Sequence, residues 1–256
     1  MQTKDQLKSQ EKNIFWHKSD KSDADYALDK LLDAIRSIEN HYIVINYNEN
    51  VPDNELQPER SFAYQLYLKW SLLLDHKPEE VISSHKLTLS GEITKHFKDD
   101  KGILSPDLVL HGGQNDTQHQ LIACEIKRKL NNSKDGKGAV LQDFIKLYHY
   151  LNLKRHVING DSDDAKYDKA VFIALNTDKE KLTYYIKMLF ENFSAIEIKQ
   201  KYLNGSSIEK LKSDILETSD NIICIYVNPS SGKPYETPET GYILLSELID
   251  SSHCHT

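Results

Sequence analysis

Two short apolar segments decide the fold of this chain: residues 103–110 (ILSPDLVL) and residues 120–127 (QLIACEIK). Each has the length and the aliphatic, partly β-branched content of a buried strand. The link between them, residues 111–119 (HGGQNDTQH), is rich in turn-forming residues. The two segments are therefore expected to pair as an antiparallel hairpin.

Polar residues interrupt both of these apolar strands. Pro106 and Asp107 lie in the first strand, and Glu125 and Lys127 lie in the second. Because side chains alternate along a strand, Glu125 and Lys127 should share one face while Ile126 points to the other. Pairing through the turn would bring Asp107 alongside Glu125. Buried acids are rare unless they are paired or bind a metal, so this pattern indicates a site for a hard divalent cation such as Mg²⁺.

The spacing of apolar residues predicts the elements around the hairpin. Helices are expected over residues 23–39, 59–75, 139–154, 178–193 and 207–217, and strands over 80–89, 169–175 and 221–228, with a last apolar segment at 241–248. Residues 42–47 (YIVINY) fit either a strand or the end of the first helix. The middle of the chain reads helix, three strands, helix, strand, which predicts an α/β or α+β fold with one mixed sheet.

The Pro-Asp and Glu-Ile-Lys residues, in this order of elements, resemble the PD-(D/E)XK superfamily of metal-dependent nucleases. That resemblance implies a restriction-endonuclease-like core, αβββαβ, with a mixed central sheet flanked by helices. It covers residues 55–176. Residues 1–54 would form an N-terminal helical extension, and residues 177–256 would add helices and strands packed on the core.

The same resemblance implies a role for each residue of the motif. Asp107 and Glu125 would bind Mg²⁺, with Mn²⁺ as a substitute, and the backbone carbonyl of Ile126 would be a further ligand. Lys127 would be the catalytic lysine that positions or activates the attacking water. A glutamate from the first core helix often joins this set in the family, and Glu59 is the candidate here.

Glu59 also has an ordinary explanation. It precedes Ala63 by four residues and Leu66 by seven, so it projects from the inward stripe of its helix and could act as a metal ligand and catalytic residue. An acid in the first turn of a helix is equally well explained by the helix dipole. Both interpretations stay open at this point.

Basic and amide side chains that follow the motif are candidates for nucleic-acid contact: Arg128, Lys129, Lys134, Lys137, Gln142 and Lys146. Residues 120–156 hold eight Lys and Arg against three Asp and Glu, a local excess of five positive charges. Such lysines can neutralise backbone phosphates while the carboxylates hold metal. Some members of the superfamily carry a Gln and a Tyr four residues apart on this helix, whereas here Lys146 stands four residues after Gln142. The alternative for Gln142 and Lys146 is that they belong to a solvated helix face.

The composition of the whole chain excludes several classes. Hydrophobic residues make up 39% and charged residues 28% of the 256 residues, which is typical of a globular protein. A net charge of −7 argues against a protein that coats nucleic acid by charge alone. Three distant cysteines provide no disulfide framework, and the start lacks an apolar signal core, so a cytoplasmic protein without a membrane partner is expected. The final His253-Cys254-His255 has no partner cluster for a metal.

The sequence therefore predicts a Mg²⁺-dependent nuclease, a hydrolase of phosphodiester bonds, with DNA as the expected substrate and endonucleolytic cleavage as the expected reaction. The alternative is a module of the same fold that binds nucleic acid or a protein partner with weak or no catalysis. The segments outside the core could also build a homodimer interface.

Overall fold

The computed structural model describes residues 22–43, 58–75, 88–91, 95–96, 103–104, 106–111, 120–152, 166–198, 203, 205–229 and 235–250. The helices are α2 (Asp23–Arg36), α3 (Pro58–Asp75), α4 (Lys134–Leu151), α5 (Lys179–Glu191), α7 (Ile208–Glu217) and α8 (Leu245–Asp250), and the short 3-10 turns are η2 (Asn40–Tyr42), η3 (Phe193–Ala195) and η4 (Ser219–Asn221). The strands are β1 (Thr88–Gly91), β2 (Lys95–His96), β3 (Ile103–Leu104), β4 (Leu108–His111), β5 (Gln120–Lys127), β6 (Lys169–Leu175), β7 (Ile222–Asn228) and β8 (Glu239–Leu244).

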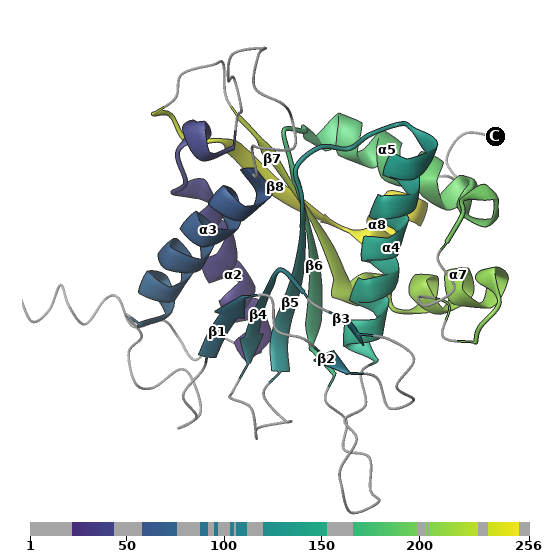
Figure 1. Cartoon of the computed structure of the whole chain (residues 1–256). Helices are drawn as coiled ribbons and strands as arrows, with labels where there is room; N and C mark the ends of the chain where they lie inside the picture. The colour runs from purple at the N-terminus through teal and green to yellow at the C-terminus, as the bar shows by residue number, and fades with distance from the viewer. Residues whose placement is uncertain are drawn as a thin grey trace, which may run out of the picture.

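Six of these strands form one mixed sheet in the order β1-β4-β5-β6-β7-β8. The strands β1, β4 and β5 are antiparallel neighbours, β5, β6 and β7 run parallel, and β8 is antiparallel to β7. Helices α2 and α3 lie on one face of the sheet, and α4, α5 and α8 lie on the other (Figure 1). The predicted mixed sheet flanked by helices is thus confirmed, and β7 and β8 continue it beyond residue 176.

Each face of the sheet has its own apolar core. On β5, Ile122, Cys124 and Ile126 belong to the core under α2 and α3, whereas Ala123 belongs to the core under α4. The expected alternation is confirmed from Ile122 to Lys127, and it leaves Glu125 and Lys127 on the face toward α4. Strand β6 contributes to both cores, as a parallel strand in the middle of a sheet does.

Helix α3 packs on the sheet through a row of residues spaced by four. Phe62, Leu66 and Trp70 are fully buried there. The apolar spacing of Ala63, Leu66, Tyr67, Trp70 and Leu74 predicts that Tyr67 faces inward. This residue is 41% exposed, so that part of the prediction is wrong. The four-residue row fixes the rotation of the helix and places Glu59, one turn before Phe62, on the side toward the sheet.

The predicted strand over residues 103–110 is in fact two strands, so that prediction is wrong. Strand β3 pairs with β2 in a separate two-stranded sheet, and β4 pairs with β5. The break falls at Pro106, which has no N–H to donate to a neighbouring strand. Pairing with β5 begins immediately after it, because the N–H of Asp107 donates to the carbonyl of Cys124 at 3.0 Å.

Helix α4 begins five residues before its predicted start. Its N-cap is Ser133, whose Oγ accepts a hydrogen bond from the N–H of Gly136 at 3.1 Å. The prediction of a loop up to residue 138 is wrong, since Gly136 and Gly138 lie inside the helix. A Cβ on Gly136 would lie 2.6 Å from the Cβ of Asn131, so close approach of the chain requires this glycine.

The remaining boundaries differ less from expectation. Helices α5 and α7 begin and end within two residues of their predicted positions, and α2 ends three residues early. Residues 44–47 and 80–87, and the segment His253-Cys254-His255, lie outside the described residues. None of the described helices combines the length and apolar character that crossing a bilayer would demand.

Candidate active site

Asp107 and Glu125 come together where β4 meets β5. Leu108 pairs with Cys124 in the antiparallel register, so one step further along the strands Asp107 lies opposite Glu125. Oδ2 of Asp107 accepts a hydrogen bond from the N–H of Ile126 at 2.6 Å. Burial raises the pKa of Asp107, and this hydrogen bond opposes the rise only in part. The carboxyl pair that the hairpin predicted is thus present in the fold.

Glu125 is almost completely enclosed, with 2% of its surface exposed. Its Oε1 accepts a hydrogen bond from the hydroxyl of Tyr150 at 2.8 Å, and its Oε2 forms an ion pair with Nζ of Lys146. Burial raises the pKa of Glu125 to about 8; Lys146 opposes this rise, while Asp143 and Asp107 add to it. One ammonium group therefore does not offset the burial and the two neighbouring acids.

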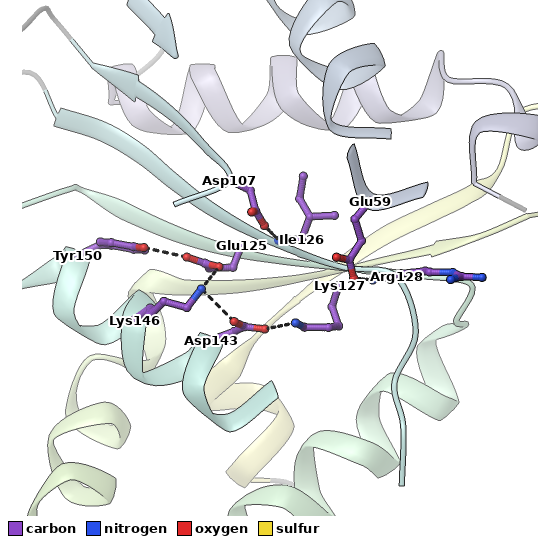
Figure 2. A network of polar contacts seen from close by, with 9 residues as sticks. All are labelled: Glu59, Asp107, Glu125, Ile126, Lys127, Arg128, Asp143, Lys146 and Tyr150. Carbon is purple, nitrogen blue, oxygen red and sulfur yellow. Dashed lines mark hydrogen bonds and ion pairs between the residues drawn. The ribbon is translucent and has the colours of Figure 1, made fainter. Parts of the chain in front are cut away.

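Lys127 is held by α4, the helix that packs on the face of β5 carrying Glu125 and Lys127. Its Nζ lies 2.8 Å from Oδ2 of Asp143 (Figure 2). Burial lowers the pKa of Lys127, but the nearby carboxylates of Asp143 and Glu59 outweigh it and leave the pKa raised. Lys127 is consequently a charged ammonium group at neutral pH, which suits an electrostatic role and not that of a general base.

Lys146 bridges two carboxylates. Its Nζ contacts Glu125 and also lies 3.1 Å from Oδ1 of Asp143. Burial lowers the pKa of this lysine, but Glu125 and Asp143 more than compensate, so its pKa is raised and it stays protonated. Asp143 thereby joins Lys127 and Lys146 through its two oxygens.

Glu59 contacts the end of the motif strand. Its Oε1 accepts a hydrogen bond from the backbone N–H of Arg128 at 2.7 Å. Of the two interpretations of Glu59, this contact favours the one in which the side chain acts beyond its own helix. The charge of Glu59 also contributes to the raised pKa of Asp107, although less than burial does.

Asn176 completes the support of the strand end. Its Nδ2 donates to the carbonyl of Arg128 at 3.1 Å and to the carbonyl of Ile43 at 3.2 Å. Asn176 has a φ of 56°, in the left-handed region that asparagine tolerates better than most residues. The backbone of Arg128 is thus held from both sides, by Glu59 and by Asn176.

The residues expected to contact nucleic acid are dispersed. Lys129 is exposed and Lys137 is half-buried, and Nζ of Lys134 lies 3.1 Å from Oε2 of Glu197. Gln142 lines a surface hollow of about 360 Å³ together with Lys134 and Glu197. Neither Asp107 nor Glu125 lines that hollow, so Gln142 lies apart from the two acids. Lys146, in contrast, contacts Glu125 directly.

Sequence reasoning missed two participants, Asp143 and Tyr150. With Lys146 they follow the spacing i, i+3, i+7 on α4, which places all three on one side of the helix. Both are buried on α4, where most of the other buried residues are apolar. An acid and a tyrosine among these apolar residues were the available signal. The spacing i, i+4, i+7 of Gln142, Lys146 and His149 indicated a different polar row on the same helix.

The cluster as a whole joins four carboxyl groups with two ammonium groups: Glu59, Asp107, Glu125, Asp143, Lys127 and Lys146 (Figure 2). The lysines balance two of the four carboxylates. In the described part of the chain, no three acidic, histidine or cysteine side chains form a ready-made metal cage. Mg²⁺ at phosphoryl-transfer sites is commonly held by one or two carboxylates, with waters and phosphate oxygens completing its shell. Asp107 and Glu125 fit that donor set.

Neither a family model, nor a curated protein, nor a solved structure matches this chain. Function has to be inferred from the site itself.

Proposed function

We propose that this protein is a Mg²⁺-dependent nuclease of the restriction-endonuclease-like class that hydrolyses phosphodiester bonds in DNA. The observation that carries the proposal is the gathering of Asp107, Glu125 and Lys127 at one place on adjacent strands of a mixed sheet. The element order α3, β1, β4, β5, α4, β6 supports it, since it is the order αβββαβ with the short β2 and β3 inserted.

The metal ligands would be carboxyl groups of the cluster, in which four carboxyl groups face only two ammonium groups. Asp107 and Glu125 would hold the cation, together with the backbone carbonyl of Ile126, and Glu59 would complete the acidic side of the site. Bound there, Mg²⁺ would supply Lewis-acid stabilisation of the negative charge that develops on a scissile phosphate. The raised pKa values of Asp107 and Glu125 support this role, because a second cation would relieve both.

Lys127 would act on the phosphate as a fixed positive charge. Asp143 holds its ammonium group on the face that carries Glu125, and the raised pKa keeps it protonated. An ammonium group in this place can donate hydrogen bonds to a non-bridging phosphate oxygen and orient the attacking water. The exposed Lys129 and the half-buried Lys137 would contact the backbone on either side.

Cleavage of supercoiled plasmid with Mg²⁺ or Mn²⁺ tests the proposal. Wild type is expected to nick and linearise the plasmid, whereas Glu125→Gln and Lys127→Met should lose about 10²–10³-fold in rate. Lys181→Met is the matched control, since Lys181 is 74% exposed and forms an ion pair with Asp178, the N-cap residue of its own helix α5. Equal cleavage by all four proteins would assign the activity to a contaminant and end the proposal.

A second candidate function follows from the Lys146 contact. Glu125 already has an ammonium partner, and a carboxylate neutralised in this way can serve as a structural ion pair in a binding module without catalysis. Such a module would bind DNA in a salt-dependent manner and take up no Mn²⁺. Calorimetric titration with Mn²⁺ separates the two, because the nuclease must bind the metal through Glu125.

A further inference from the structure

Both carboxylate oxygens of Glu125 are occupied by donors from a single helix. The hydroxyl of Tyr150 donates to Oε1 at 2.8 Å, and Nζ of Lys146 contacts Oε2. The two donors lie four residues apart on α4, the helix that packs against β5 (Figure 2). A cation that binds Glu125 therefore meets an ammonium group already placed on one of its two oxygens.

Lys146 has a second carboxylate partner. Its Nζ lies 3.1 Å from Oδ1 of Asp143, whose other oxygen holds Lys127. The lysine side chain has four flexible methylene groups, so a small rotation can break its contact with Glu125 while it keeps its contact with Asp143. The helix thus offers the ammonium group two carboxylates, of which only Glu125 belongs to the proposed ligand set.

We propose that Lys146 is a resident counter-ion that occupies Glu125 in the metal-free protein and retreats to Asp143 when a divalent cation binds. This inference rests on the proposed function, because it takes Glu125 to be a metal ligand. The ionised form of Glu125 is a buried charge beside Asp107, and a buried charge without a partner is strongly destabilising. Lys146 supplies the positive charge that stabilises this carboxylate, and it therefore competes with the metal for Glu125.

The competition has a measurable consequence. If Lys146 contacts Glu125 most of the time, only a small fraction of the molecules is ready for the metal, and the apparent affinity is reduced by that fraction. Removing the ammonium group should then raise the affinity for Mn²⁺ by about tenfold or more. It should also lower the melting temperature of the metal-free protein, and Mn²⁺ should restore it.

Titration of Mn²⁺ by calorimetry into wild type, Lys146→Met and Lys127→Met makes the test, with no cleavage involved. Lys127→Met is the matched control. Lys127 has the same charge as Lys146 and contacts the same Asp143, but it forms no ion pair with Glu125. We expect a gain of about tenfold or more for Lys146→Met and less than about threefold for Lys127→Met. Lys146→Gln, which keeps a donor for Glu125 without the charge, replaces Lys146→Met if that protein does not fold.

Three outcomes decide the matter. A selective gain at position 146, or Mn²⁺ binding that only the Lys146 variants show, supports the inference. Equal affinities, or equal gains at both positions, overturn it while the proposed metal site stands, provided Glu125→Gln abolishes binding. Absence of Mn²⁺ binding in every protein overturns both the inference and the proposed metal-dependent nuclease.

Discussion

Nζ of Lys127 lies 2.8 Å from Oδ2 of Asp143, so the lysine of the motif is held by a carboxylate on the helix α4. The second oxygen of Asp143 lies 3.1 Å from Nζ of Lys146. One buried carboxylate therefore sets the positions of both ammonium groups in the cluster. Asp143 acts through these lysines, which makes it a positioning residue for the reaction proposed above.

Asp143→Asn should reduce DNA cleavage by about 10–100-fold, because Lys127 loses the partner that holds it in place. The substitution also removes the main cause of the raised pKa of Lys127, so the pKa of the ammonium group should fall. The alkaline limb of the pH–rate profile is expected to move to lower pH, since activity requires the charged form. Single-turnover cleavage over a range of pH measures both effects.

Two comparisons keep this prediction distinct from a loss of folding. Asp143→Glu retains the charge and should recover part of the activity and the wild-type alkaline limb. DNA binding measured without divalent metal should stay within about threefold of wild type. A uniform fall in activity with an unchanged pH profile would show that Asp143 supports only the packing of α4.

The stability of the metal-free protein should fall as pH rises from about 5 to about 8. The ordinary pKa of Glu125 is 4.5 and burial raises it to about 8 in the folded protein. Between these values the folded protein keeps the proton and the unfolded chain has lost it, so increasing pH favours unfolding. The raised pKa of Asp107 acts in the same direction. The slope for Glu125 alone is at most about 1.4 kcal/mol per pH unit.

Urea denaturation in the presence of a chelator, repeated at several pH values, measures this slope. Glu125→Gln removes the titrating group and should flatten the dependence, leaving the smaller contribution of Asp107. Identical slopes for wild type and Glu125→Gln would mean that Glu125 is ionised throughout this range, with Lys146 fully offsetting its burial.

Much of this arrangement could be predicted from the sequence, because it follows from the geometry of strands. A period of two placed Glu125 and Lys127 on one face of β5, and the hairpin brought Asp107 beside them. The break between β3 and β4 was not predicted, since apolar residues stand on both sides of Pro106 and Asp107 and together have the length of a single strand. Proline removes a ladder hydrogen bond, but the sequence does not say whether the strand bends there or changes sheet.

The partners of the motif could not be predicted, because they depend on how α4 is rotated against the sheet. That helix buries Val140, Leu141, Phe144, Ile145 and Leu147, so apolar residues occupy more than one side of it. Its hydrophobic pattern therefore does not identify the face toward β5. Only the packed structure distinguishes the row of Asp143, Lys146 and Tyr150 from the row of Gln142, Lys146 and His149.

Tyr150→Phe should lower the free energy of unfolding by about 1–2 kcal/mol, because Glu125 loses its donor at Oε1 inside the core. In a Glu125→Gln background the same change should cost less, since a neutral amide depends less on a donor. The difference between the two costs gives the coupling energy of the pair. Equal costs in both backgrounds would indicate that the hydroxyl contributes through packing alone.

Glu59→Ala and Glu59→Gln separate the two tasks that we assign to this side chain. The carboxylate accepts a hydrogen bond from the N–H of Arg128 at 2.7 Å, and the amide oxygen of glutamine can accept the same bond. Glu59→Ala should therefore destabilise the protein by about 1 kcal/mol, whereas Glu59→Gln should leave its stability within about 0.5 kcal/mol of wild type.

Metal binding should respond in the same way to both substitutions, unlike stability. Both remove the charge of Glu59, so both should weaken Mn²⁺ binding, by about threefold to tenfold if Glu59 stands near the metal without replacing Asp107 or Glu125 as a ligand. A Glu59→Gln protein that keeps wild-type stability and wild-type Mn²⁺ affinity would limit Glu59 to fixing the backbone of Arg128. The acidic side of the site would then consist of Asp107 and Glu125, and the contact between α3 and β5 would serve only to hold the strand from which Lys127 projects.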